Sequence, residues 1–195
     1  KKSTWRKSGK RCDWMRLNDP LDTSFVYEGR EYKIDLAFDN VLDVFDVLSD
    51  DSLRDYEKIE ICLELLLGEQ DYVPTVELWN HIYKNFIEIK RKQPIQYDLK
   101  GNPLPVQEGD DDERLIDLER DAEYIYASFL QAYGINLFEQ QRKLHWHEFK
   151  ALLHGLPSDT SMQRIIQIRL WKPSKGESSE YRESMRKLQK IYALE

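Results

Sequence analysis

Residues 121–157 constrain the fold most, because they contain two stretches of apolar side chains at helical spacing. In the first stretch the spacing of three and four residues recurs at Ala122, Ile125, Tyr126, Phe129, Leu130 and Tyr133. This pattern forms one face of a helix, and Gly134 is suited to end it. The second stretch carries Trp146, Phe149, Leu153 and Leu156 before Pro157. Two amphipathic helices must bury these faces against each other or against further helices.

The rest of the chain predicts more helices and one small hairpin. Apolar residues recur at helical spacing over 41–48, 53–67 (with Tyr56 inward), 76–87 (with Val76 inward), 115–133, 162–170 and 181–192. Ser158 or Thr160, and Ser178 or Ser179, are suited to cap the last two of these helices. Residues 25–27 and 31–34 flank Glu28-Gly29-Arg30, which predicts a β-hairpin. We therefore expect a mainly α fold of six or seven helices with a small N-terminal β-hairpin.

The length and composition predict one domain with two irregular segments. A chain of 195 residues fits a single domain. Residues 1–20 are expected to form a basic arm and residues 21–195 a single helical domain. Residues 93–113, rich in Pro, Gly and Asp, are expected to be an inserted loop. The longest apolar run, residues 65–67, is too short to span a bilayer, so no membrane partner is expected.

The charge distribution argues against a nucleic-acid partner. Residues 1–16 carry seven basic side chains and one acidic one, whereas the net charge of the whole chain is -7. The acidic side chains are therefore concentrated in the body of the chain, which repels phosphate. The two cysteines, Cys12 and Cys62, form neither a disulfide framework nor a zinc-binding pattern, which is consistent with a reducing cytoplasm.

The candidate chemical groups are weak. On a helix His145 and His147 would point about 200° apart and could not hold one metal ion. Glu77 and His81 show no third ligand, so no metal and no cofactor are expected. Arg142 and His147 match the Arg-x4-His spacing of a superfamily of all-helical ribonucleases, the HEPN type. There the two residues would act on a ribose 2′-OH and the scissile phosphate. The pattern is short, and on a straight helix the two side chains lie about 140° apart.

Several segments together resemble one phage protein family. They are residues 117–129 (DLERDAEYIYASF), 133–137 (YGINL), 144–157 (LHWHEFKALLHGLP) and 190–194 (KIYAL). Their order and spacing closely resemble the phage gene-product-15 family, small proteins encoded in the tail module of siphophages and prophages of Gram-positive bacteria. The hairpin over 27–34 and the helix around 55–60 (DYEKIE) are also similar. The resemblance covers roughly residues 20–194, and the basic arm and the loop over 93–113 depart from it.

The resemblance implies a role in tail assembly, because the gene in this family usually lies just ahead of the tape-measure gene. It implies a non-enzymatic chaperone, or a partner of one, that works in the host cytoplasm. Its expected partners are the helical tape-measure protein and other tail-assembly proteins, with self-association left open. A structural tail or connector protein of the virion is an alternative, and the ribonuclease is another. Aromatic residues are enriched at interface hot spots, so the expected protein-binding residues are Tyr124, Tyr126, Trp146, Tyr181 and Tyr192.

Overall fold

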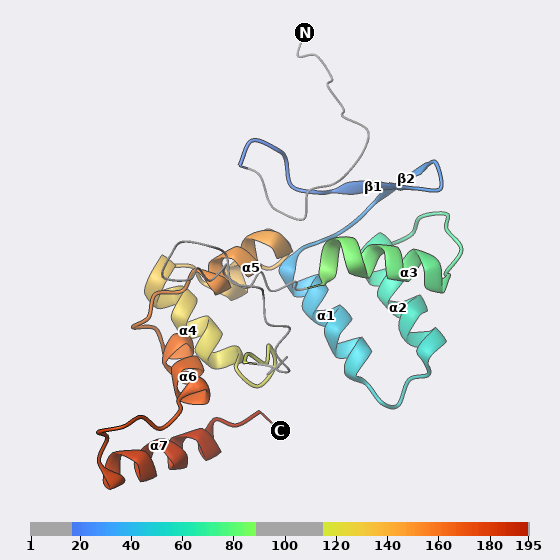
Figure 1. The fold of residues 1–195 in the computed structure, drawn as a ribbon. Coiled ribbons are helices and arrows are strands. Elements are labelled where there is room, and N and C mark those ends of the chain that lie inside the picture. Colours follow the sequence, from blue (N-terminus) through green and yellow to red (C-terminus); the bar gives the residue numbers. More distant parts are fainter. Residues whose placement is uncertain (1–16, 89–114, 195) are drawn as a thin grey trace, which may run out of the picture. The chain divides into compact units, whose positions relative to one another are not determined.

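The computed structural model describes residues 17–88 and 115–194, and these are mainly α-helical with one small β-hairpin (Figure 1). The chain divides into two compact units. Unit 1 comprises residues 1–88 and 142–149, and unit 2 comprises residues 89–141 and 150–195. The division falls within helix α5, Trp146–His154. The predicted fold class is thereby confirmed, whereas the single helical domain over 21–195 stays a prediction.

Unit 1 begins with the hairpin and continues with helices. Its elements are β1 Ser24–Tyr27, β2 Arg30–Lys33, α1 Phe38–Ser49, α2 Asp55–Leu67, α3 Val76–Ile82, a π-helical turn η1 Tyr83–Ile87 and the first turn of α5. The strands are antiparallel, with Tyr27 opposite Arg30. Glu28 and Gly29 form the turn with φ of 49° and 81°. Two successive positive φ values match the right-handed twist of the strands, as two-residue hairpins require.

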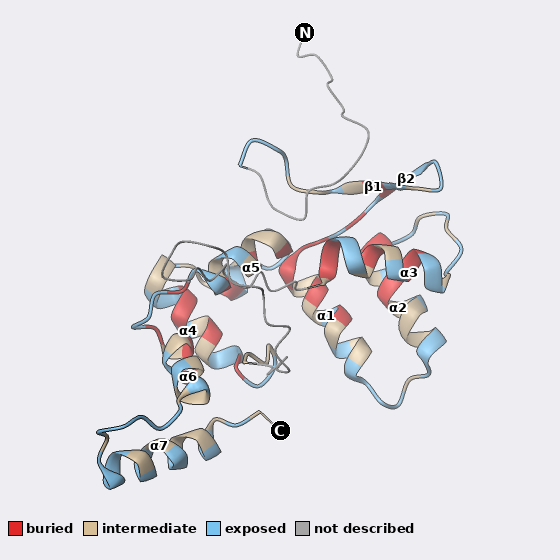
Figure 2. Cartoon of the chain, viewed as in Figure 1, coloured by how far each residue is buried: buried red, intermediate tan, exposed pale blue. Residues whose placement is uncertain are grey.

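The core of unit 1 joins segments that are far apart in the sequence. Helices α1 and α2 pack on each other through apolar residues, shown in red in Figure 2. A β-bridge between Ala37 and His145 brings residues 142–149 into the same unit. There the Phe38 and Phe149 rings stack at 5.1 Å. The indole N–H of Trp146 donates to the carbonyl oxygen of Ile87 at 3.0 Å, so this buried polar group is satisfied.

Two residues predicted to face inward are exposed in unit 1. Tyr56 and Val76 are about half exposed. Both lie in the first turn of their helix, α2 and α3 respectively, where the side chain extends beyond the packed face. The Tyr56 ring instead lies under the Arg54 guanidinium at 4.5 Å, a cation–π contact at the surface.

Unit 2 is built around helix α4, Ala122–Tyr133, which packs on α6, Ser161–Leu170. Its other described elements are the one-turn 3₁₀ helix η2 Leu137–Gln140, the rest of α5, and α7 Ser179–Ile191. Gly134 follows α4 with φ of 65°, as its position in the sequence predicted. The amide of Ile135 donates to the carbonyl of Phe129 at 3.4 Å, which completes a glycine cap of the Schellman type.

Helix α4 begins seven residues later than predicted, because side-chain hydrogen bonds stabilise a turn before it. The sequence predicted a helix from 115, but α4 starts at Ala122. The Asp117 carboxylate accepts the backbone N–H groups of Glu119 and Arg120, both at 3.0 Å. Such local bonds compete with the helical ladder. The acidic run over 110–113, most of the basic arm and the loop over 93–113 lie outside the described residues.

Candidate protein-binding surface

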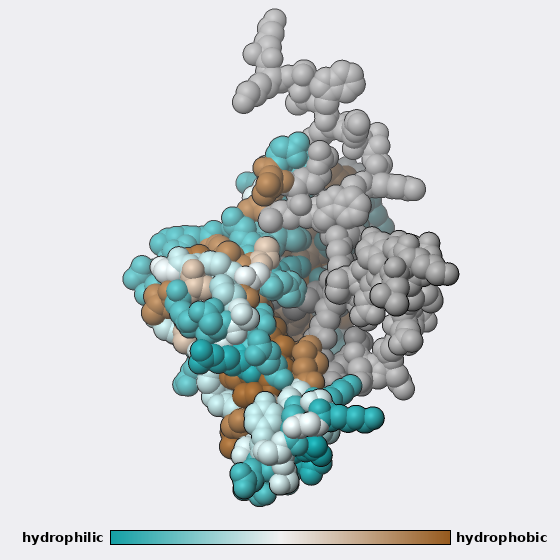
Figure 3. Space-filling view, turned by 60° about the vertical axis from the view of Figure 1, so that its left-hand side comes forward, coloured by the Kyte–Doolittle hydropathy of each residue, from teal (hydrophilic) through white to brown (hydrophobic). Residues whose placement is uncertain are grey.

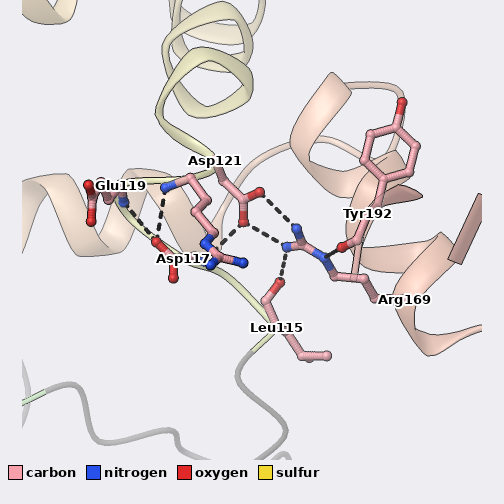
Figure 4. Close-up of polar contacts among 7 residues, drawn as sticks. Leu115, Asp117, Glu119, Asp121, Arg169 and Tyr192 are labelled. Carbon is pink, nitrogen blue, oxygen red and sulfur yellow. Dashed lines mark hydrogen bonds and ion pairs between the residues drawn. The ribbon is translucent and has the colours of Figure 1, made fainter. Parts of the chain in front are cut away.

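A buried arginine organises unit 2 (Figure 4). Arg169 in the last turn of α6 donates from Nη1 and Nη2 to the two carboxylate oxygens of Asp121, at 2.7 and 2.8 Å. Nη1 also donates to the carbonyl of Leu115 and Nε to the carbonyl of Tyr192, both at 2.7 Å. One side chain therefore joins the segment before α4, the helix α6 and the residue after α7.

The Arg169–Asp121 ion pair is buried, and both side chains make further hydrogen bonds. The two side chains are only 9% and 3% exposed. Asp121 Oδ2 also accepts the backbone N–H of Asp117 at 2.9 Å, so the carboxylate is held from two sides. Desolvation of two charges is offset only when the geometry is good and the remaining donors and acceptors are used. The pair therefore holds the segment before α4 against α6, and Arg169 also holds the backbone of Tyr192.

Helix α7 lies on the surface of unit 2. It packs on α6, yet none of its residues is buried, and in Figure 2 it carries no red segment. Ser178 Oγ caps its first turn by accepting the N–H of Tyr181 at 3.1 Å. The Gln189 side chain donates to the carbonyl of Trp171 at 2.8 Å and secures its far end. Ile191 in its last turn is 69% exposed. The apolar side of this amphipathic helix is thus only partly covered.

A second exposed apolar group lies on α4 and η2. The Tyr126 ring contacts the Phe138 ring at 5.2 Å, and Phe138 is 70% exposed. Asn136 fixes Phe138, because its side-chain oxygen accepts the Phe138 N–H at 3.1 Å. Leu130, one turn after Tyr126 on the same helix, is also exposed. Figure 3 shows apolar residues, in brown, reaching the surface among hydrophilic residues, in teal.

We define the unit 2 apolar surface as the exposed large apolar residues of that unit: Leu130, Phe138, Leu170, Tyr181 and Ile191. Of these five, the sequence interpretation named only Tyr181 as protein-binding and missed Leu130, Phe138, Leu170 and Ile191. The signal for Phe138 was the Asn136 before it, a residue that starts short helical turns. Ile191 was assigned to the apolar side of the last helix, and only its exposure distinguishes it from a packed residue.

The five aromatic residues expected to bind protein do not form one group. Tyr124 and Tyr192 are in edge contact at 6.0 Å, beside the Arg169 pair. Tyr126 is paired with Phe138, as described above, and Tyr181 meets Trp171 edge-on at 6.2 Å. Trp146, in contrast, lies in the core of unit 1 with no exposed surface. This burial gives Trp146 a packing role in unit 1.

The two histidines lie together, contrary to the helical argument. Helix α5 begins at Trp146, so His145 precedes it, and the His145 and His147 rings stack at 5.2 Å. His145 Nδ1 accepts the backbone N–H of His147 at 3.1 Å, and its Nε2 lies 3.1 Å from the carbonyl of Asp22. With Nδ1 as the acceptor, Nε2 is the ring nitrogen placed to donate to the Asp22 carbonyl. The described residues contain no group of three His, Cys, Asp or Glu side chains that could hold a metal ion.

Arg142 and His147 do not share a helix. Arg142 has a positive φ of 58° in the turn before α5, and its backbone N–H donates to Asp39 Oδ1 at 2.9 Å. The estimate of 140° between the two side chains, which assumed a straight helix, is therefore wrong. The Arg-x4-His spacing alone supports no catalytic arrangement.

The fold is mainly helical, and unit 2 exposes several large apolar side chains. The family model described as Bacteriophage Gp15 protein matches residues 17–194. The chain therefore belongs to the Bacteriophage Gp15 protein family and is a phage structural or assembly protein. No curated protein and no solved structure matches it significantly. Among the described helices, each is too short or too polar to cross a bilayer.

Proposed function

We propose that the protein is a tail-assembly chaperone that binds the tape-measure protein in the host cytoplasm during tail morphogenesis. Membership of the Bacteriophage Gp15 protein family supports a structural or assembly role. The observation that carries the finer proposal is helix α7, which presents apolar residues at the surface and buries none of them. A long tape-measure chain exposes amphipathic helices, and such helices bind to partly apolar helical surfaces.

The charge of the molecule fits this role. The chain has a net charge of -7 and a pI near 5.3. An acidic protein keeps a complex with an aggregation-prone client soluble and repels host nucleic acid. Several copies on one long client would each need only modest affinity, because linked sites bind with avidity.

The test is co-expression with the tape-measure protein encoded beside it, followed by affinity capture. We expect the parent protein to capture the tape measure. Phe138→Ser and Ile191→Ser should each weaken capture about tenfold or more, as loss of an apolar hot spot does. Arg186→Ser is the matched control, because Arg186 is an exposed polar residue of α7. Equal capture by all four proteins would contradict the role of this surface.

Purified virions distinguish the chaperone from a structural tail or connector protein. A chaperone leaves the tail before maturation, so the protein should be absent from virions by mass spectrometry. Presence at a fixed copy number would contradict the chaperone proposal and favour the structural role, which the family membership also supports.

A further inference from the structure

The two edges of the N-terminal hairpin differ in how they are protected. Strand β2 has the sequence Arg-Glu-Tyr-Lys, and its outer edge is covered by Gln70. The Gln70 side-chain amide accepts the N–H of Lys33 at 2.9 Å and donates to the carbonyl of Lys33 at 2.8 Å. These are the two bonds that a neighbouring strand would make. Arg30 on the same strand also forms an ion pair with Asp71 at 3.1 Å.

Strand β1 lacks such protection. In an antiparallel pair, residues alternately direct their backbone groups toward the partner strand and away from it. Thr23 faces β2, because its carbonyl accepts the N–H of Ile34 at 3.0 Å. Ser24 and Val26 therefore direct their N–H and C=O groups away from β2. Within the described part of the chain, no hydrogen bond to these four outward groups is found.

The composition of β1 makes this edge unusual. Natural proteins protect edge strands by keeping them very short, or with charges, proline or bulges. Strand β1, Ser-Phe-Val-Tyr, is short at 4 residues, but it contains no charge and no proline, although 33% of the chain is charged. The Val26 side chain is 56% exposed.

We propose that the outer edge of β1 pairs antiparallel with the same edge of a second copy of this chain. The register with Phe25 on the two-fold axis uses all four outward groups of each copy. There Ser24 of each copy faces Val26 of the other, and the outward groups form four backbone hydrogen bonds. The strand carries no charge, so self-pairing brings no like charges directly opposite each other. This inference goes beyond the proposed function and does not depend on it.

Two matched double variants test the pairing and its register. S24K/V26K places lysine opposite lysine at both symmetric positions, whereas S24E/V26K places glutamate opposite lysine at both. Both variants lose the Ser24 Oγ bond to Glu31 (2.8 Å). Residue 24 also lies opposite Lys33 within each hairpin, so circular dichroism and thermal unfolding must first show that both monomers stay folded. We expect a concentration-dependent dimer for the parent chain and S24E/V26K by sedimentation velocity. The dimer dissociation constant of S24K/V26K should be about tenfold higher or more, with circular dichroism unchanged.

The outcomes separate clearly. A parent chain that stays monomeric over a wide concentration range would overturn the proposal. Two double variants that behave alike would overturn the antiparallel register, because only that register opposes residue 24 to residue 26. Hydrogen exchange gives a second measurement that needs no mutation: the Ser24 and Val26 amides should become protected as concentration rises. An unchanged exchange rate for these amides at rising concentration would also count against the pairing.

Discussion

At the scale of single residues, the buried Arg169–Asp121 pair and the further bonds of Arg169 join three segments of unit 2. Removing one partner leaves the other charge buried and unpaired, which typically costs about 3–5 kcal/mol. We therefore expect Asp121→Asn and Arg169→Gln each to lower the free energy of unfolding by roughly 3 kcal/mol. Urea denaturation measures this.

Lys187→Gln is the control for the ion-pair prediction. It breaks the pair with Glu183 at 2.8 Å, whose two side chains are 71% and 69% exposed. Exposed pairs contribute about 0–1 kcal/mol, so this variant should unfold almost like the parent. If the three variants lost similar stability, the central position of Arg169 would be contradicted.

Burial in the fold changes the chemistry of Cys62. It is fully buried, and burial raises the pKa of its thiol from 9.0 to about 11. The thiolate is the reactive form, so a disulfide reagent at pH 8 should modify Cys62 only after unfolding. The measurement is reagent kinetics in a Cys12→Ser background, with and without urea. Rapid modification of the folded variant would show that the thiol is accessible.

The raised pKa of Cys62 also predicts a pH dependence. Between pH 9 and 11 the unfolded thiol releases its proton and the folded thiol keeps it. The unfolded state therefore binds fewer protons, and the free energy of unfolding falls as pH rises through this window. In Cys62→Ala the decline should be shallower than in the parent. Parallel pH curves for the two proteins would contradict the assigned cause.

At the scale of elements, α7 depends on its cap because it has no buried residue. Removing a serine N-cap costs about 1 kcal/mol. Ser178→Ala should therefore increase amide exchange in α7 about fivefold while exchange in α4 stays unchanged. Ser179→Ala is the control, since Ser179 follows the cap and is exposed. A similar effect of both substitutions would mean that the cap does not limit opening of the helix.

The sequence pattern predicted some of the helix ends and missed others. Gly134 ends α4 and Ser178 caps α7, as predicted, because each acts through its own local backbone. The sequence pattern missed the start of α4. Asp117 and Asp121 form hydrogen bonds in the turn before the helix, and Asp121 is paired with Arg169, which lies 48 residues away on α6. The π-helical turn after α3 was also missed, because residues 83–87 keep the apolar spacing of a helix.

At the scale of the whole molecule, the structure leads to a prediction about the ribonuclease alternative. Arg142 lies in the turn before α5, so Arg142 and His147 do not lie on one helix. We therefore expect the purified protein to leave a single-stranded RNA substrate intact at a level matching a protein-free control. Cleavage by the parent protein that disappears in His147→Ala would contradict this expectation and support the ribonuclease alternative.

The sequence by itself determined the fold class, the hairpin and the family. Apolar spacing, Gly29, Gly134 and the cap Ser178 act over a few residues, and the motifs over 117–157 are read in order along the chain. Only the tertiary structure decided which aromatic residues are buried. Trp146 and Phe138 are both aromatic, yet a bridge from Ala37 to His145 helps bury the first, and the second stays exposed on η2. Burial depends on contacts between distant segments, which local patterns do not encode.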